Sequence, residues 1–258
     1  MAATYLDKIL ARHREIAAAD TRRFEPLLDQ ARSAERPRGF RAALAGRQRL
    51  GVIAEIKRRS PSKGDLNIGL DAAELAATYE RGGAACMSVL TDVEHFGGSV
   101  ADLQAARAAC SLPVIRKDFT VSERDVLDAR IMGADCVLLI AAALEPAELV
   151  AFHSLAIDVG LDVLVEIHDE AELDHALAAE ATLIGVNQRD LVTFQVDHER
   201  AVRMASVIPD TAVKVAESGV RDAVDARSLR DAGYDAVLVG ETLVTSADPV
   251  AALGMLAV

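Results

Sequence analysis

The sequence predicts an α/β fold: a closed (β/α)8 TIM barrel with an N-terminal helical extension. Eight short runs rich in β-branched residues lie within residues 51–258, and amphipathic Ala- and Leu-rich stretches separate them. These 208 residues, divided among eight units, give 26 per unit, about the length of one strand plus one helix. An open doubly wound sheet is the alternative, but even spacing without a Gly-x-Gly-x-x-Gly segment favours closure.

The predicted strands are similar in length and composition. Three of them also share a pattern, in which a helix-ending glycine (Gly83, Gly133 or Gly233) is followed by a small residue and an apolar run. The strands are predicted at GVIAEI (51–56), CMSVL (86–90), PVIRK (113–117), DCVLLI (135–140), DVLVEI (162–167), TLIGVN (182–187), AVKVAE (212–217) and DAVLVG (235–240).

Helices are predicted where a capping residue precedes an amphipathic stretch. Such residues are Asp71, Ser99, Ser122, Asp169 and Asp248, the last followed by a proline. In the extension, LDKILARHREI predicts a helix and RSAERPRGFR a loop. We expect residues 1–258 to form a single domain, with residues 1–50 as the helical extension and residues 51–258 as the barrel.

Composition excludes several classes of partner. The net charge of -12 disfavours nucleic acid and anionic membranes. The start of the chain, MAATYLDKILARHRE, lacks the apolar core of a secretory signal, and no run of about 18 apolar residues predicts a membrane span, so we expect a cytoplasmic protein. Cys86, Cys110 and Cys136 form no C-x-x-C pair, which indicates reduced thiols.

Basic residues are concentrated at the N-terminal side of the chain. Residues 1–63 contain 15 Lys and Arg against 7 Asp and Glu. RNA binding is one interpretation, but the few aromatics of this segment are a poor stacking platform. We expect instead that the segment folds over an acidic body and lends cations to the mouth of a pocket.

Charged and polar side chains gather at the predicted carboxyl ends of strands, where barrels of this class place catalytic groups. Two carboxylates and two lysines in one cavity suit proton transfer at a carbonyl or alcohol. We expect cations near the lysines, Arg189 among them, to ease their deprotonation; Schiff-base chemistry is the competing use of a lysine. The residues are Glu55, Lys57, Lys117, Glu166, Asn187, Arg189, Glu217, Ser218 and Gly219.

Two glycine-containing turns predict a phosphate site. Ser218-Gly219 and Gly240-Glu241 follow the last two predicted strands, where such barrels commonly offer backbone N–H groups to a phosphate. A phosphorylated small-molecule substrate is therefore expected. Residues 58–64, a polar loop with three cations, are a candidate lid.

Two histidines and one lysine are not expected to contribute to a functional site. His168 and His175 flank an acidic stretch, but their spacing without a cysteine is a poor match to zinc, so no metal site is predicted. Lys214 has the opposite strand parity to Glu217 and is expected to lie away from the site.

Several segments resemble the signature segments of indole-3-glycerol phosphate synthase, in order and over nearly the whole chain. They are AEIKRRSPSKG, LTDVEHFGGS, VIRKDF, LVEIHDEAEL, IGVNQRDL, VAESGV and VLVGETL. The resemblance implies a (β/α)8 carboxy-lyase of tryptophan biosynthesis, an aromatic amino acid pathway. Such an enzyme closes the ring of 1-(2-carboxyphenylamino)-1-deoxyribulose 5-phosphate, with loss of carbon dioxide and water, and uses no cofactor.

The resemblance also implies catalytic roles. Lys117 matches the general acid that protonates the substrate carbonyl, and Glu166 matches a carboxylate that stabilises or deprotonates the cationic intermediate. Glu55 and Lys57 match groups of the dehydration step, and Lys57 also contacts phosphate. Asn187 matches a residue that orients the carboxylates, and Glu217 one that binds substrate hydroxyls.

Binding roles follow in the same way. The resemblance implies that Ser60 and Arg189 lie near the anthranilate carboxylate, that apolar side chains hold the aromatic ring, and that the two glycine turns hold phosphate, at position 241 through its backbone N–H alone. The apolar residues are Phe96, Phe119 and Leu138; the phosphate residues are Ser218, Gly219, Gly240 and Glu241, together with Lys57.

Three classes of function remain at this point. Besides the lyase, a sister phosphosugar isomerase such as phosphoribosylanthranilate isomerase would need a Cys/Asp pair that these strand ends do not provide. A catalytically silent, anion-binding or RNA-associated protein would not need the carboxylates and lysines described above. We expect a monomer or weak homo-oligomer.

Overall fold

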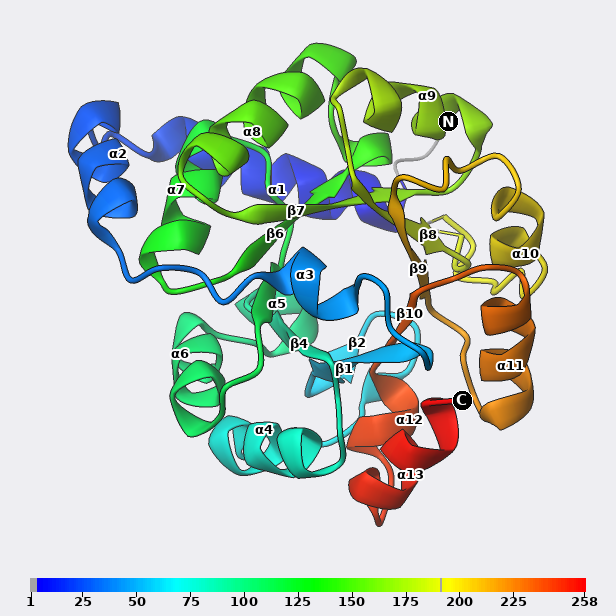
Figure 1. The fold of residues 1–258 in the computed structure, drawn as a ribbon. Coiled ribbons are helices and arrows are strands. Elements are labelled where there is room, and N and C mark those ends of the chain that lie inside the picture. Colours follow the sequence, from blue (N-terminus) through cyan, green and yellow to red (C-terminus); the bar gives the residue numbers. More distant parts are fainter. Residues whose placement is uncertain (1–3, 191) are drawn as a thin grey trace.

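The computed structural model describes residues 4–190 and 192–258 (Figure 1). Eight parallel strands close into a barrel in the order β1-β10-β9-β8-β7-β6-β5-β4, which confirms the predicted fold class. Residues 1–3 of the predicted extension and residue 191 lie outside the described part. The barrel strands are β1 (Gly51–Ile56), β4 (Cys86–Leu90), β5 (Val114–Lys117), β6 (Cys136–Ile140), β7 (Asp162–Ile167), β8 (Leu183–Asn187), β9 (Val213–Glu217) and β10 (Ala236–Val239).

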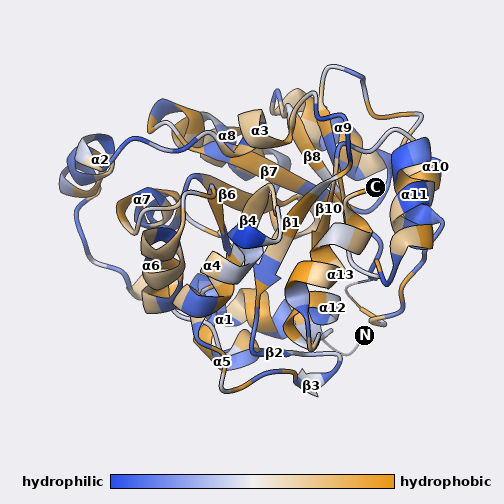
Figure 2. Ribbon diagram, turned by 60° about the horizontal axis from the view of Figure 1, so that its bottom comes forward, coloured by the Kyte–Doolittle hydropathy of each residue, from blue (hydrophilic) through white to orange (hydrophobic). Residues whose placement is uncertain are grey.

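Helices surround the barrel, and the strands between them are strongly hydrophobic (Figure 2). All five predicted caps are confirmed, because each side chain accepts a hydrogen bond from a backbone N–H in the first turn. The outer helices are α4 (Ala72–Arg81), α6 (Val100–Ala109), α7 (Glu123–Ile131), α8 (Pro146–Asp158), α9 (Glu170–Ala178), α10 (Arg200–Met204), α11 (Ala223–Asp231) and α13 (Pro249–Leu256).

Short elements occupy the loops at the carboxyl ends of the strands. The hairpin formed by β2 (Arg59–Ser60) and β3 (Gly64–Asp65) follows β1, where the candidate lid was predicted. Helix α5 (Val93–Phe96) follows β4, the 3-10 turn η1 (Ala141–Ala143) follows β6, and α12 (Glu241–Val244) follows β10. These loops supply much of the surface around the candidate site.

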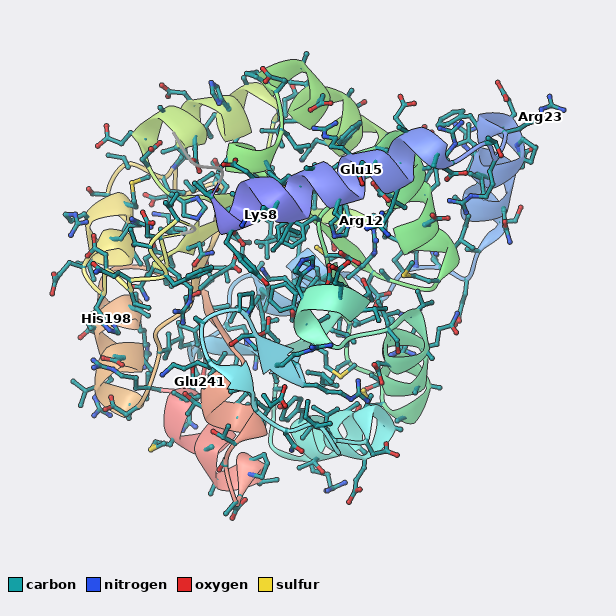
Figure 3. The ribbon with its side chains drawn as sticks, turned by 180° about the vertical axis from the view of Figure 1, so that it is seen from behind. Lys8, Arg12, Glu15, Arg23, His198 and Glu241 are labelled. Carbon is teal, nitrogen blue, oxygen red and sulfur yellow. The ribbon has the colours of Figure 1, made fainter. Side chains whose placement is uncertain are left out.

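The N-terminal extension wraps the barrel from one end to the other. Helix α1 (Tyr5–Ala19) lies across the carboxyl end of the strands, and α2 (Phe24–Ser33) packs against α7 (Figures 1 and 3). Helix α3 (Phe40–Leu44) lies on the opposite side, where Phe40 and Leu44 are fully buried in the inner cluster of the barrel. The predicted loop RSAERPRGFR was too long, because its two ends belong to α2 and α3.

Ion pairs fasten the extension to the acidic body, as predicted. Arg14 pairs with Glu148 of α8 at 2.6 Å, and Arg22 pairs with Asp128 of α7 at 2.7 Å. The guanidinium of Arg38 instead donates to three backbone carbonyl oxygens, those of Arg107, Cys110 and Leu112. These three arginines of the extension therefore bind acidic side chains and backbone carbonyl groups of the same chain.

The barrel interior is built in layers from alternate strands. Inward side chains of β1, β5, β7 and β9 form one apolar layer: Ile53, Ile115, Leu164 and Val215. Because side chains on a strand alternate between its two faces, the residues two positions later point inward from the same four strands. Those residues are Glu55, Lys117, Glu166 and Glu217, so the layer at the carboxyl end is charged.

The cysteines are free thiols, as predicted. Cys86 and Cys136 are fully buried in the inner cluster, and burial raises the pKa of both thiols. Among residues 4–190 and 192–258, no helix is long and apolar enough to cross a membrane.

The position of α3 predicts a large contribution to stability. Phe40→Ala removes a fully buried ring from the amino end of the barrel and should lower the free energy of unfolding by about 3 kcal/mol or more. Ile16→Ala, at a side chain that is 52% exposed on α1, is the matched control and should change it by less than about 0.5 kcal/mol. Urea unfolding measures both. Equal stabilities of the two variants would show that α3 does not close the barrel.

Candidate active site

A cavity of about 550 Å³ opens at the carboxyl end of the barrel. Every residue predicted for the site contributes to its lining, although these residues are spread over more than 180 positions of the sequence. They are Glu55, Lys57, Ser60, Phe96, Lys117, Phe119, Leu138, Glu166, Asn187, Arg189, Glu217, Ser218, Gly219, Gly240 and Glu241.

Lys117 lies between two buried carboxylates at the base of the cavity. Its Nζ atom is 3.2 Å from Glu166 Oε2 and 3.5 Å from Glu217 Oε2. The two glutamate side chains are 1% and 2% exposed, whereas that of Lys117 is 16% exposed. The ammonium group is therefore the member of this trio that is more accessible from the cavity.

A second ion pair stands on β1 and just beyond it. Lys57 Nζ lies 2.5 Å from Glu55 Oε1. The hydroxyl of Ser88, on the neighbouring strand β4, donates to Glu55 Oε2 at 3.4 Å. Glu55 is thus fixed from two sides, and Lys57 remains at the cavity wall.

Asn187 connects the carboxylate layer with the loops above it. Its Nδ2 donates to Glu166 Oε1 at 3.0 Å, and its Oδ1 accepts from the Ser218 hydroxyl at 2.8 Å and from the Arg189 backbone N–H at 3.0 Å. This donor and acceptor pattern defines which way the amide faces. The amide therefore ties the orientation of Glu166 to the turn after β9.

The electrostatics of Lys117 correct one prediction. Burial acts to lower the pKa of Lys117, but the charges of Glu166, Glu217 and Glu55 outweigh it and hold this pKa above its usual value. Easier deprotonation was expected from nearby cations. However, the guanidinium of Arg189 donates to the Phe194 carbonyl at 3.0 Å, and the nearest charges to Lys117 are negative. Lys117 is therefore held as an ammonium ion.

The pKa values of the two carboxylates beside Lys117 are shifted in opposite directions. Burial acts to raise the pKa of Glu166, but Lys117 and His168 outweigh it, so this pKa is lowered. Burial, with the nearby charges of Glu166 and Glu55, raises the pKa of Glu217 to about 7. The site thus holds one ionised carboxylate and one that takes up a proton near neutral pH.

Two glycines make room for the carboxylates. A Cβ atom at Gly185 would lie 2.2 Å from Glu217 Oε1, and one at Gly240 would lie 2.3 Å from Glu55 Oε1. Both contacts are too close for a side chain. Gly185 was not among the predicted site residues; its signal in the sequence was a glycine inside a strand, which often marks the close approach of another group.

The turns proposed for phosphate adopt special backbone geometry. Ser218 and Gly219 both have positive φ angles, 68° and 78°. A Cβ at Gly219 would lie 2.5 Å from Val196 Cγ1, so both space and φ require glycine there. At the second turn, Glu241 pairs with Lys63 of the β2–β3 hairpin, Nζ to Oε1 3.4 Å, which joins the candidate lid to the far side of the mouth.

The apolar wall of the cavity includes residues that sequence reasoning missed. The predicted rings of Phe96 and Phe119 lie 6.4 Å apart between centroids. Helix α1 adds Tyr5, Leu6 and Ile9; Ile9 is four residues after Tyr5 and three after Leu6, so it neighbours both on the helix surface.

The basic segment 1–63 was expected to lend cations to the mouth of the cavity. None of the cations of residues 4–50 lines the cavity, so the expectation was wrong for that part of the segment. Figure 3 shows Lys8 and Arg12 on the outer side of α1. Lys57 and Lys63, which follow β1 and belong to the same basic segment, do line the cavity. Helix α1 thus presents its apolar face to the cavity and its charged face to solvent.

Groups that could hold a metal are already hydrogen-bonded to protein. His13, Asp92 and Asp118 form such a cluster, which sequence reasoning did not find. His13 Nε2 lies 3.0 Å from Asp92 Oδ2, and Asp118 accepts from Thr91 and Arg116. The cluster holds α1 against the barrel.

Lys214 lies outside the site, as predicted. Its Nζ donates to the Ala205 carbonyl at 3.0 Å and to Asp210 at 3.1 Å. These partners lie in the segment from the end of α10 to the start of β9, so the ammonium group sits on the outer side of the barrel.

Comparisons with known proteins agree with this geometry. Solved structures with the same fold include 3-hexulose-6-phosphate synthase, with a TM-score of 0.63 and 16% identity over 80% of this chain and 98% of that one. Thiamine phosphate pyrophosphorylase from Pyrococcus furiosus has a TM-score of 0.61 and 16% identity over 80% and 93%. At such identity they show the fold alone.

Sequence relatives are more specific. A curated protein of Bordetella pertussis (strain Tohama I), named indole-3-glycerol phosphate synthase, is 49% identical over 249 residues, which cover 95% of each chain. The family model described as indole-3-glycerol phosphate synthase matches residues 6–256. This chain therefore belongs to the indole-3-glycerol phosphate synthase family.

Proposed function

We propose that this chain converts 1-(2-carboxyphenylamino)-1-deoxyribulose 5-phosphate into indole-3-glycerol phosphate, and that Lys117 is its general acid. The observation that carries the proposal is the Lys117 ammonium group, held between Glu166 and Glu217 at the base of a single cavity. A group that donates a proton must first hold one, and the surrounding carboxylates favour the charged form of this lysine.

In the first step, a carbon–carbon bond forms between the substrate ring and its carbonyl carbon. The ring carbon that bears the carboxylate attacks, and the carbonyl oxygen takes a proton from Lys117 and becomes a hydroxyl group. The ring is then cationic. Loss of carbon dioxide returns the bonding electrons to the ring and restores aromaticity. Glu166, whose pKa is lowered, supplies negative charge beside this cation.

Dehydration completes the indole. The new hydroxyl group takes a proton and leaves as water, and a proton leaves the five-membered ring. The ion pair of Lys57 and Glu55 suits the first transfer, and Glu166 suits the second because it is ionised. Glu217, with its raised pKa, can donate as well as accept hydrogen bonds to the substrate hydroxyls.

Binding groups flank this centre. We propose that the turns at Ser218-Gly219 and Gly240-Glu241 hold the phosphate through backbone N–H groups, with Lys57 beside them. Arg189 and Ser60 are assigned to the anthranilate carboxylate, since a guanidinium group suits a carboxylate. The aromatic ring is assigned to a wall that consists of Phe96, Phe119 and Leu138.

The extension and the barrel contribute to one site. We infer that residues 1–258 act as a single domain, because α1 lines the cavity and α3 closes the other end of the barrel. We further propose a monomer or weak homo-oligomer that works in the cytoplasm without a cofactor. Schiff-base chemistry at Lys117 is disfavoured, because an ammonium group is not a nucleophile.

A direct assay tests the assignment of Lys117. The purified chain, mixed with the carboxyphenylamino-deoxyribulose phosphate, should produce indole fluorescence. Lys117→Ala should lower kcat at least about 10²-fold, the usual effect of removing a general acid. Lys8→Ala, on the outer side of α1, is the matched control and should keep wild-type activity (Figure 3). A fully active Lys117→Ala would refute the role.

The raised pKa of Glu217 predicts a pH-dependent stability. The pKa is about 7 in the folded chain against an ordinary value of 4.5, so the folded chain binds more protons between these pH values. The free energy of unfolding should therefore fall as pH rises through this window, by roughly 3 kcal/mol for this one group.

Glu217→Gln removes the titrating group while it keeps the shape of the side chain. From pH 4.5 to 8 the wild type should lose roughly 3 kcal/mol more than the variant in urea unfolding. Parallel pH dependences of the two proteins would contradict the raised pKa.

A further inference from the structure

His168 occupies a position beside the catalytic layer that the assignments above leave without a role. It follows β7 two residues after Glu166, and its side chain is 12% exposed. Its Nε2 atom lies 3.8 Å from Glu166 Oε1, is buried, and has no hydrogen-bond partner among the described residues. A buried ring nitrogen in this state requires an explanation.

The other ring nitrogen identifies the state of the ring. His168 Nδ1 lies 3.0 Å from Glu172 Oε2 of α9, and the same oxygen accepts the His168 backbone N–H at 2.8 Å. A carboxylate can only accept, so Nδ1 carries a hydrogen. In the neutral ring, Nε2 would then turn a lone pair toward the Glu166 carboxylate. In the imidazolium ion, Nε2–H points toward negative charge instead.

The charges around the ring favour the imidazolium. Glu166 of β7 and Glu172 of α9 both face it, and Arg200 of α10 is the opposing cation. The guanidinium of Arg200 donates to the Asn187 carbonyl at 2.9 Å. Burial acts to lower the pKa of His168, but the two carboxylates outweigh burial and Arg200, and the pKa is raised.

The consequence concerns the two carboxylates that share Lys117. Glu166 also receives the Asn187 amide at 3.0 Å and faces His168, whereas Glu217 Oε1 has no hydrogen-bond partner among the described residues. A neighbouring cation within about 4–6 Å typically lowers a carboxyl pKa by about one unit or more. His168, together with the Asn187 amide, therefore distinguishes Glu166 from Glu217, and of these two groups only His168 can supply a full positive charge.

We propose that His168 is a positioning residue for the reaction: as an imidazolium ion bound to Glu172, it orients Glu166 and keeps Glu166, rather than Glu217, as the ionised carboxylate beside Lys117. The inference rests on the proposed function, because Glu166 is assigned there to the cationic intermediate. His168 itself acts only through Glu166.

The pH dependence of kcat/KM separates this role from a structural one. His168→Gln removes the cation, so the pKa of Glu166 should rise and the acidic limb of the profile should move up by about one pH unit. The kcat/KM of the wild type divided by that of the variant should then be about tenfold larger at pH values below the acidic limb than at pH values above it. A loss of equal size at every pH, or an unchanged profile, overturns the proposal.

Two further variants sharpen this test. Glu172→Gln keeps the ring but removes the carboxylate that favours its charge, so the acidic limb should move in the same direction by a smaller amount. His175→Gln, on the exposed side of α9, is the matched control and should reproduce the wild-type profile. A wild-type profile for Glu172→Gln would overturn the pairing with Glu172.

A measurement made without substrate tests the charge of His168 independently of the proposed enzymatic function. In NMR spectra of histidine-labelled protein, His168→Gln identifies the His168 signal. That signal should titrate above the ordinary value of about 6.5, and Glu172→Gln should lower its midpoint. Titration at or below 6.5 overturns the imidazolium. Absence of ring closure by the wild type would instead refute the proposed function, and with it the role of His168 in that reaction.

Discussion

The structure depends on the burial of a compact set of opposite charges at one end of a hydrophobic barrel. Removing each charge from water is costly, and the cost is offset only if every charge faces an opposite one at short range. Lys117 meets this condition with Glu166 and Glu217, and Lys57 meets it with Glu55. At pH values below about 7, where Glu217 is protonated, two ammonium groups match two carboxylates. The raised pKa of Glu217 therefore reduces the excess negative charge of the cluster.

Barrel geometry explains why these charges can meet at all. Four of them stand on alternate strands, two residues beyond an apolar layer that the same strands form. Packing of the apolar layer fixes the register of the strands, and the register fixes the charged layer above it. Glycine at positions 185 and 240 leaves the space that Glu217 and Glu55 fill. The apolar layer that stabilises the barrel therefore also positions the charged side chains that carry the proposed chemistry.

Much of this was predictable from the sequence, because the signals are local. Strand parity places Glu55, Lys117, Glu166 and Glu217 on the inner face at strand ends, and capping side chains such as Asp71 and Ser99 mark helix starts. Contacts between residues that are far apart in the sequence were harder to predict from such local signals. The raised pKa of Lys117 follows from Glu166, Glu217 and Glu55, which three other strands bring close to it. Arg189 turns toward the Phe194 carbonyl, which no periodicity indicates.

The extension and His168 also make contacts that local sequence signals do not predict. Helix α2 has a sequence signal that was not used, because its apolar residues Phe24, Leu27, Leu28 and Ala31 are spaced as on one helix face. The burial of α3 depends instead on where the chain travels around the barrel. His168 was considered only as a metal ligand with His175, seven residues away. Its actual neighbours are Glu166 on the strand before it and Glu172 one helical turn after it, and only three-dimensional placement relates that pair to Lys117.

The most direct test of the shared cavity is a crystal structure of this chain with indole-3-glycerol phosphate bound. We expect the phosphate within hydrogen-bond distance of the backbone N–H groups of Gly219 and Glu241. We also expect the indole ring to lie against Phe96 and Phe119, with Lys117 and Glu166 at its edge. A ligand bound on another surface, or one whose ring lies away from Lys117, would contradict this expectation.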